Sequence, residues 1–253
     1  VGHGAGFKNT TGDSNSGFGR YAGFGNLTGD GNTFVGSNAG LSDNVTSHSY
    51  NTGIGFEVLK DLTDGAFNEA MGKQALQNLT TGDSNIGIGT DALGSATTSH
   101  NLIAIGRGAG YAITNETADG TIAIGRSALA SLTSGAKNVS IGFESQLYQT
   151  DGSNNVTIGY KALRNADNGE SDNVVIGKEA GVNINHASAD ANVIIGSNAG
   201  FGGAGPMSGA IVIGANAMNS TGANTITGAV AVGYNSLTAL TSGTGNTAIG
   251  YGS

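Results

Sequence analysis

The chain of 253 residues contains no cysteine, so a disulfide framework and a thiolate metal site are both excluded. It has no tryptophan and one proline, Pro206, and its glycines do not recur at every third residue, which excludes a collagen triple helix. Charged residues make up only 11%, and the net charge of −8 argues against a protein that binds nucleic acid through its phosphates. No apolar run approaches the about 18 residues of a transmembrane helix, so we expect no membrane insertion.

Glycine is abundant instead, at 46 of 253 residues. A glycine-rich chain with few charges is either a flexible low-complexity segment or a repeat, and self-similarity at a fixed period separates the two. Here an apolar residue followed by glycine, as in Ile88-Gly89, recurs along the whole chain at intervals of 17 to 19 residues. We call these the rung glycines: Gly2, Gly19, Gly36, Gly55, Gly72, Gly89, Gly106, Gly125, Gly142, Gly159, Gly177, Gly196, Gly214, Gly233 and Gly250.

In nine coils, from Ile86 to Val230, a second apolar residue lies two positions before the residue that precedes the rung glycine, as in Ile86 and Ile88. A spacing of two is the alternation of a β-strand, so both columns face the same side of a strand. Small residues such as Ala22 and Ala39 follow three positions after the glycine, and polar turn residues fill the remainder. We expect one apolar column to form the structural core: Ile88, Ile105, Ile124, Ile141, Ile158, Ile176, Ile195 and Ile213.

This pattern predicts an all-β protein, a parallel β-solenoid or β-roll of about 14 coils, because paired helices need more than 30 residues per repeat. We expect a single continuous array over residues 1–253 with no separate domains. The chain begins and ends inside a repeat, so we also expect it to be cut from a longer fibre protein.

The segment Thr121–Ala128, with the sequence T-I-A-I-G-R-S-A, resembles the head repeats of trimeric autotransporter adhesins, also called YadA-like heads. The segment Gly245–Ser253 is similar to the repeat arrays of bacteriophage tail fibres. The resemblance covers the whole chain and implies a left-handed roll, a homotrimeric fibre and a role in attachment. Adhesin-head repeats are shorter, so each coil here carries a larger turn.

The residues give a separate reason to expect more than one chain. A layer of alanine and glycine buries little apolar area per residue, so a thin roll would gain from packing its Ile/Val face against copies of itself. A wider monomeric solenoid that encloses the same columns is the alternative.

Five turn aspartates each lie six residues before a rung glycine and so share one edge: Asp13, Asp30, Asp83, Asp119 and Asp190. Asp13 and Asp30 fall on neighbouring coils, where two carboxylates either splay apart or share a cation. Calcium needs six to eight oxygen ligands, so plain turn aspartates are favoured and the pair is a weak metal candidate. We expect no cofactor.

The position after the rung glycine forms an outward column of cationic and aromatic residues: Arg107, Arg126, Phe143, Tyr160 and Lys178. It is either a strip that contacts a glycan or receptor, or a solvated ladder of cross-strand pairs, which we favour. The next position reads Glu144, Lys161, Glu179, an alternation that suits a charge ladder better than a catalytic acid and base.

No catalytic constellation emerges, and we expect no enzyme. The sequence favours a structural and adhesive segment of an extracellular fibre on a cell surface or virion, with other copies of itself and a cell-surface glycan or protein receptor as partners. One alternative is a monomeric ice- or surface-binding solenoid, although Thr33, Thr52, Thr157 and Thr247 do not form one row. A tailspike-like polysaccharide depolymerase is a further alternative.

Overall fold

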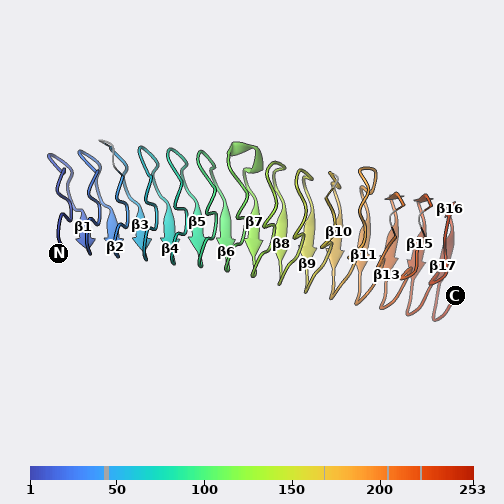
Figure 1. Cartoon of the computed structure of the whole chain (residues 1–253). Coiled ribbons are helices and arrows are strands. Elements are labelled where there is room, and N and C mark those ends of the chain that lie inside the picture. Colours follow the sequence, from blue (N-terminus) through green and yellow to red (C-terminus); the bar gives the residue numbers. More distant parts are fainter. Residues whose placement is uncertain (43–45, 168, 204, 223) are drawn as a thin grey trace. The chain divides into compact units, whose positions relative to one another are not determined.

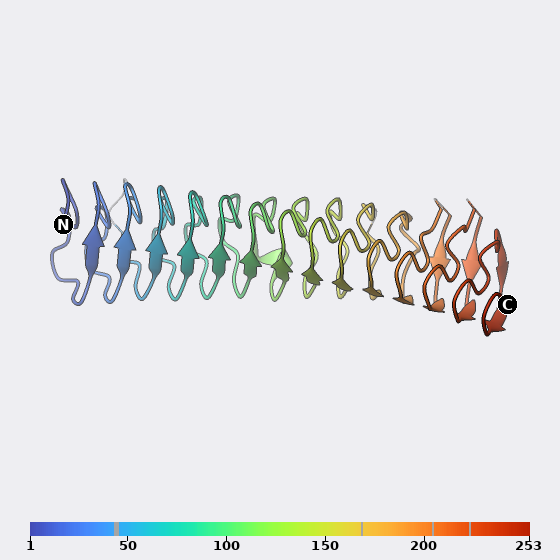
Figure 2. The same cartoon turned by 90° about the horizontal axis from the view of Figure 1, so that it is seen from below.

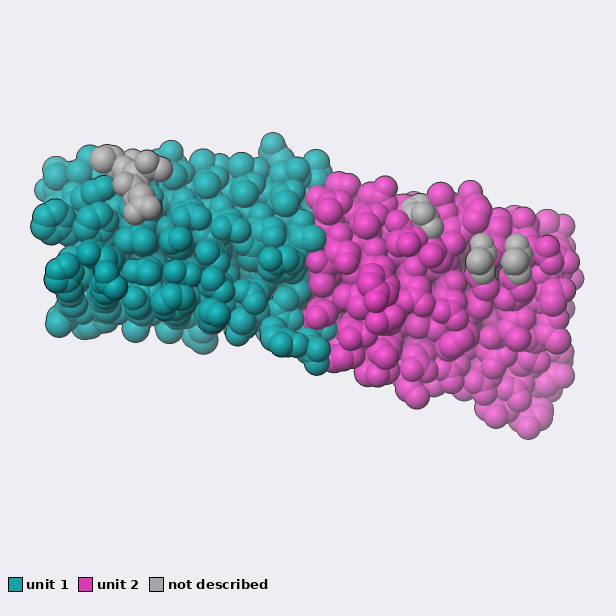
Figure 3. All heavy atoms as spheres, viewed as in Figure 1, with its two compact units in different colours: residues 1–126 teal, residues 127–253 magenta. Residues whose placement is uncertain are grey.

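The computed structural model describes residues 1–42, 46–167, 169–203, 205–222 and 224–253. The chain divides into two compact units, Val1–Arg126 and Ser127–Ser253, which Figure 3 distinguishes by colour and which we describe separately. Both are all-β, as predicted, and each is a parallel β-solenoid in which one short strand recurs in every coil (Figures 1 and 2).

In the first unit, consecutive strands pair in parallel, and the register joins residues 17 or 19 positions apart, such as Ser16 with Thr33 and Ile103 with Ile122. The longer interval before the last strand contains a 3-10 turn, η1, over Glu116–Ala118. The strands are β1 Ser16–Phe18, β2 Thr33–Val35, β3 Thr52–Ile54, β4 Glu69–Met71, β5 Ile86–Ile88, β6 Ile103–Ile105 and β7 Ile122–Ile124.

In the second unit the register spacing is 17 to 19 residues, as in Val139 with Val156 and Val174 with Val193. The main sheet contains β8 Val139–Ile141, β9 Val156–Ile158, β10 Val174–Ile176, β11 Val193–Ile195, β13 Ile211–Ile213, β15 Val230–Val232 and β17 Thr247–Ile249. A smaller parallel sheet contains β12 Met207–Ser208, β14 Ile226–Thr227 and β16 Gly243–Thr244.

The rung glycines end each strand of the main sheets because no other residue fits there. Gly89 and Gly106 have φ of +129° and +131°, values that side chains with a Cβ rarely adopt. A Cβ on Gly89 would lie 2.7 Å from the carbonyl oxygen of Gly106 in the next coil. The recurring glycine therefore lets successive coils approach backbone to backbone.

Left-handed backbone recurs at three further positions of each coil. In one coil it occurs at Ser84, just before the strand, and at Asp91 and Leu93, two and four residues after the rung glycine. The other coils repeat these positions with glycine, asparagine, leucine and other residues, and among the described residues none with positive φ is valine, isoleucine or threonine. This agrees with the steric cost of left-handed backbone, which is highest for β-branched side chains.

The isoleucine column that was expected to form the structural core does not fill the interior of the coil. The residue between the two apolar columns points inward instead: Ala104, Ile194 and Val212 are at most 1% exposed. Ile105 is 36% and Ile213 is 37% exposed on the outer face, and the rest of the column is also exposed or half-buried: Ile88, Ile124, Ile141, Ile158, Ile176 and Ile195. The two columns do share a face, as predicted, but it is the outside of the coil.

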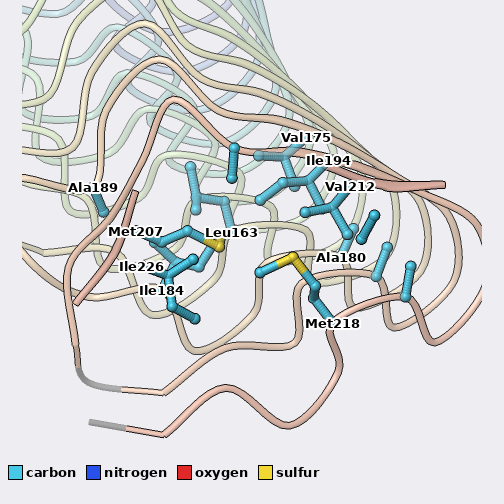
Figure 4. Close-up of a cluster of buried hydrophobic side chains, with 14 of the residues drawn as sticks. Leu163, Val175, Ala180, Ile184, Ala189, Ile194, Met207, Val212, Met218 and Ile226 are labelled. Atoms are coloured by element: carbon cyan, nitrogen blue, oxygen red, sulfur yellow. The ribbon is translucent and has the colours of Figure 1, made fainter. Parts of the chain in front are cut away.

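Small and aliphatic side chains fill the interior. In the second unit, Val175, Ile194 and Val212 from β10, β11 and β13 lie in a row inside the coils (Figure 4). They face Leu163 and Ile184 from the opposite side of the coil, within one cluster of buried residues. From Ala22 on, every alanine that lies three residues after a rung glycine is fully buried, for example Ala162 and Ala199, whereas Ala5 of the first coil is half-buried.

Asparagines, all buried except the exposed Asn15, form a ladder at one corner of the coil. The side-chain oxygen of each accepts the backbone N–H of the corresponding residue in the next coil, at 2.9–3.1 Å. Each ladder asparagine from Asn32 on also donates from Nδ2 to a turn carbonyl of the next coil, as Asn68 does to Gly82 at 2.8 Å. The ladder residues are Asn15, Asn32, Asn51, Asn68 and Asn85, and in the second unit Asn138, Asn155, Asn173 and Asn192.

Candidate binding surfaces

The outer face of the main sheet carries a repeated apolar surface in each unit. In the first unit it includes Ile86, Ile103 and Ile122 beside the exposed Ile88 and Ile105. In the second unit, residues in register on neighbouring strands form two apolar columns on this face. One column contains Val139, Val156, Val174, Val193, Ile211 and Val230, and the other contains Ile141, Ile158, Ile176, Ile195, Ile213 and Val232. Soluble monomers rarely expose contiguous apolar patches of more than a few hundred Å², so this repeated apolar face is a candidate interaction surface.

The predicted outward column of cationic and aromatic residues has members in both units. Arg107 and Arg126 belong to the first unit and are exposed. In the second unit, the rings of Phe143 and Tyr160 stack with centroids 5.4 Å apart and planes 11° apart, and the Lys178 side chain is 62% exposed. Coil-on-coil stacking is what a ladder of cross-strand pairs gives, and the glycan or receptor contact of this column stays a prediction.

The neighbouring charge column is arranged differently from the expected alternation. Glu144 accepts a hydrogen bond from Nε of Arg164 at 2.8 Å, and Lys161 lies over the ring of Tyr160, 5.0 Å from its centroid. The pKa of Arg164 is raised above its usual value by its hydrogen bonds and charge interactions with Glu144 and Tyr148, which outweigh the opposing effect of desolvation. Glu144 and Arg164 thus form an ion pair between coils.

The aspartate row serves the backbone of neighbouring coils. Oδ1 of Asp30 accepts the N–H of Asp13 at 2.7 Å, and Oδ1 of Asp83 accepts the N–H of Ala66 at 2.6 Å. His100 continues the row by accepting the N–H of Asp83 at 3.0 Å. In the described part of the chain, no three His, Asp or Glu residues form a group that could hold a metal ion.

One histidine is enclosed within the first unit. His48 is fully buried against Phe34, with ring centroids 5.5 Å apart, and its Nδ1 lies 3.5 Å from Oδ1 of Asn32. Desolvation lowers the pKa of His48 from 6.5 to about 4, although a backbone hydrogen bond opposes this. The ring is therefore neutral at pH 7.

A buried polar group replaces part of the apolar interior near β8 and β9. Oγ of Ser145 lies 2.9 Å from Oγ1 of Thr157, which lies 2.8 Å from Oε1 of Gln146. Thr157 is therefore an inward residue, and it does not share an outward row with Thr33, which is half-buried, or Thr52, which is exposed. This arrangement gives no support to a threonine surface for ice binding.

An aromatic cluster that sequence reasoning missed lies beside an open hollow on the first three coils. The hollow has a volume of about 740 Å³, and His3, Phe7, Arg20, Tyr21, Phe24 and Asn38 line it. These residues lie one, two or five positions after a rung glycine. The signal in the sequence is the set of aromatic residues at these positions in the first two coils, which do not belong to the single outward column predicted above.

Comparisons with family models, with curated proteins and with solved structures found no match for this chain. Among the residues described, there is no helix with the length and hydropathy needed to cross a membrane.

Proposed function

We propose that this chain is a structural and adhesive segment of an extracellular homotrimeric fibre, belonging to a virion or a bacterial surface. The observation that carries the proposal is the outer Ile/Val face. It repeats in every coil from β5 to β7 and from β8 to β15, and its isoleucines remain exposed or half-buried in the single chain. Three copies that turn this face inward would bury it, with the polar turns left outside.

The resemblance of Thr121–Ala128 to adhesin-head repeats and of Gly245–Ser253 to tail-fibre arrays supports the attachment role. The solenoid is compatible with it, since hydrogen bonds between coils run along a fibre axis. In this proposal the chain acts as a spacer that presents a receptor-binding surface at a distance, and it uses no cofactor.

Light scattering after size exclusion tests the assembly. A trimer has a native mass of about 75 kDa, three times the chain mass of 24.9 kDa. Ile105→Lys together with Ile158→Lys should shift the mass to that of one chain, because each places a charge in the shared seam. Thr90→Lys is the matched control, since Lys73 occupies the same position one coil earlier. A folded wild-type monomer at all concentrations would exclude the trimer.

A further inference from the structure

The aromatic cluster of the first coils is held rigidly by contacts between coils. Phe7 and Phe24 stack with centroids 5.7 Å apart and planes only 7° apart. Tyr21 meets Phe24 edge to face at 5.3 Å and meets His3 in the same way at 5.4 Å. The Tyr21 ring lies over Gly4, where a Cβ would be 2.5 Å from the ring. The rings therefore form a fixed apolar surface at the edge of the hollow.

Cations lie on the ring faces of this cluster. The guanidinium of Arg20 lies 4.8 Å from the centroid of Tyr21, and Nζ of Lys8 lies 5.0 Å from that of Phe24. In a chain with a net charge of −8, Arg20 and His3 line the hollow, and Lys8 lies beside it on the ring of Phe24. The only carboxylates of side chains in residues 1–42 are Asp13 and Asp30 of the aspartate row. Asp30 accepts a hydrogen bond from the backbone N–H of Asp13.

These features together define the chemistry of a ligand. Flat aromatic surfaces bind the apolar C–H faces of pyranose rings, whereas the fork of an arginine binds a carboxylate through two hydrogen bonds. The amide of Asn38 adds a donor and an acceptor suited to hydroxyl groups. The hollow is open rather than enclosed, which suits sugar rings that lie along the surface of several coils.

We propose that the first three coils form a binding site for an acidic saccharide, a sugar chain that bears carboxylates. Tyr21 and Phe24 stack on sugar rings, and Arg20 pairs with the carboxylate. The biological meaning of the site, as the receptor contact of an attachment fibre, rests on the proposed function. Binding itself does not, because all the residues that carry it come from one chain.

Calorimetric titration of the full chain with trigalacturonic acid tests the site, and the methyl ester of the same trisaccharide removes only the charges. We expect the acid to bind at least about tenfold more tightly than the ester, and its affinity to fall with added salt. Triglutamate supplies charge without sugar rings and should bind at least about tenfold more weakly than the acid. Equal binding of triglutamate, or no binding of the acid at millimolar concentration, would overturn the proposal.

Variants can use residues that other coils already carry. Arg20→Ser copies Ser37 and should weaken binding of the acid about tenfold while binding of the ester changes little. Tyr21→Asn copies Asn38 and should weaken both probes. The control is Phe67→Ser, which copies Ser84 and removes a ring that stacks on Tyr50 at 5.3 Å, two residues before the strand of each coil.

If Phe67→Ser weakens binding as much as Tyr21→Asn, or if Arg20→Ser leaves the preference for the acid intact, the assignment is wrong. Circular dichroism checks that each variant is folded. Light scattering on the same samples reports the trimer separately, so failure of the saccharide site and failure of the fibre give different results.

Discussion

The coils that carry Asn51, Asn68 and Asn85 and the coils that carry Ala210 and Ala229 hold the same corner of the solenoid by different means. In the first region, Nδ2 of Asn68 donates to the Gly82 carbonyl at 2.8 Å and to Oδ1 of Asn51 at 3.0 Å. In the second region the turn itself becomes a strand, and β12, β14 and β16 pair through their backbones.

The residues that fill the corner change together with the hydrogen bonds. Where the ladder has asparagine, the residue three positions earlier is often glycine, as at Gly65 and Gly82, and a Cβ on Gly82 would collide with the Ser99 carbonyl. Where alanine replaces asparagine, the corner holds Met207 or Ile226, which are 3% and 1% exposed. A large ladder residue thus accompanies a small residue three positions earlier, and a small ladder residue accompanies a large one. Either combination keeps the corner filled.

The rung glycines are common to both regions and should show the largest effect. Gly89→Ala combines an unfavourable φ with a collision against the Gly106 backbone, and Gly214→Ala does the same against Gly233. We expect each to lower the free energy of unfolding by about 4 kcal/mol, from backbone strain and overpacking together. Guanidinium unfolding followed by far-UV circular dichroism measures the loss.

Gly209→Ala is the matched control for these variants. Its φ is also positive, at +62°, but a Cβ there would meet no heavy atom within 4 Å. We expect a cost of about 1 kcal/mol from strain alone. An equal cost at Gly209 and Gly89 would show that the close approach of successive coils is unimportant.

The asparagine ladder should give the next largest effect. Asn68→Ala removes two Nδ2 donors and leaves the buried N–H of Asn85, which is bonded to Asn68 Oδ1 at 3.0 Å, without its acceptor. We expect a loss of about 3 kcal/mol of unfolding free energy, because each orphaned buried group costs about 1–3 kcal/mol. Asn165→Ala, which breaks a half-buried amide pair with Asn183 and a hydrogen bond from Arg164, orphans no fully buried group and should cost about 1 kcal/mol. Similar losses for the two would contradict the importance of the ladder.

The sequence predicted the repeat and its register well because both follow from backbone constraints. The rung glycines predicted intervals of 17 to 19 residues, and strand pairs such as Val139 with Val156 confirm this spacing. The alternation of Ile86 and Ile88 showed that the two side chains share a face, but alternation cannot say which face is inside. The side chain of Ala104 points into the coil because of the width of the coil, and that width depends on the path of the turns.

The surfaces were harder to predict than the fold. The stacking of Phe143 on Tyr160 follows from their shared position in the repeat and could be read from the sequence. The hollow near Tyr21 could not, because its shape depends on the left-handed turn at Tyr21 and on Gly4 beneath its ring. The asparagine ladder was visible as a column, but its hydrogen bonds depend on how closely the coils stack.

His48 occupies the corner position, three residues before a ladder asparagine, where several coils have glycine. It makes the stability of that coil depend on pH. Because its pKa is lowered to about 4 in the fold, the unfolded chain, with a pKa near 6.5, binds more protons between these values. Stability should therefore fall as the pH drops from 6.5 to about 4, by no more than about 3 kcal/mol.

His48→Gly copies Gly29 and Gly65 and should remove this contribution to the pH dependence, although it also loses the contact with Phe34. The carboxylates titrate in both proteins, so the difference between the two pH profiles isolates His48. Unfolding measured at several pH values from 7 to 4 gives both profiles, and parallel profiles would show that the buried ring does not titrate as expected.

The smallest effects should show whether side chains or backbone groups make the hydrogen bonds between coils at the aspartate row. Asp83→Ala removes the acceptor of the Ala66 N–H, which lies 2.6 Å from Oδ1, and should cost about 1 kcal/mol, whereas Asp83→Asn retains an acceptor. Ser208 occupies the same row in β12, where its backbone oxygen accepts the N–H of Gly228 at 2.9 Å. Ser208→Ala keeps that bond, so we expect a change within about 0.5 kcal/mol. If Ser208→Ala costs as much as Asp83→Ala, the short strands do not replace the side-chain bonds, and the two regions are held in the same way.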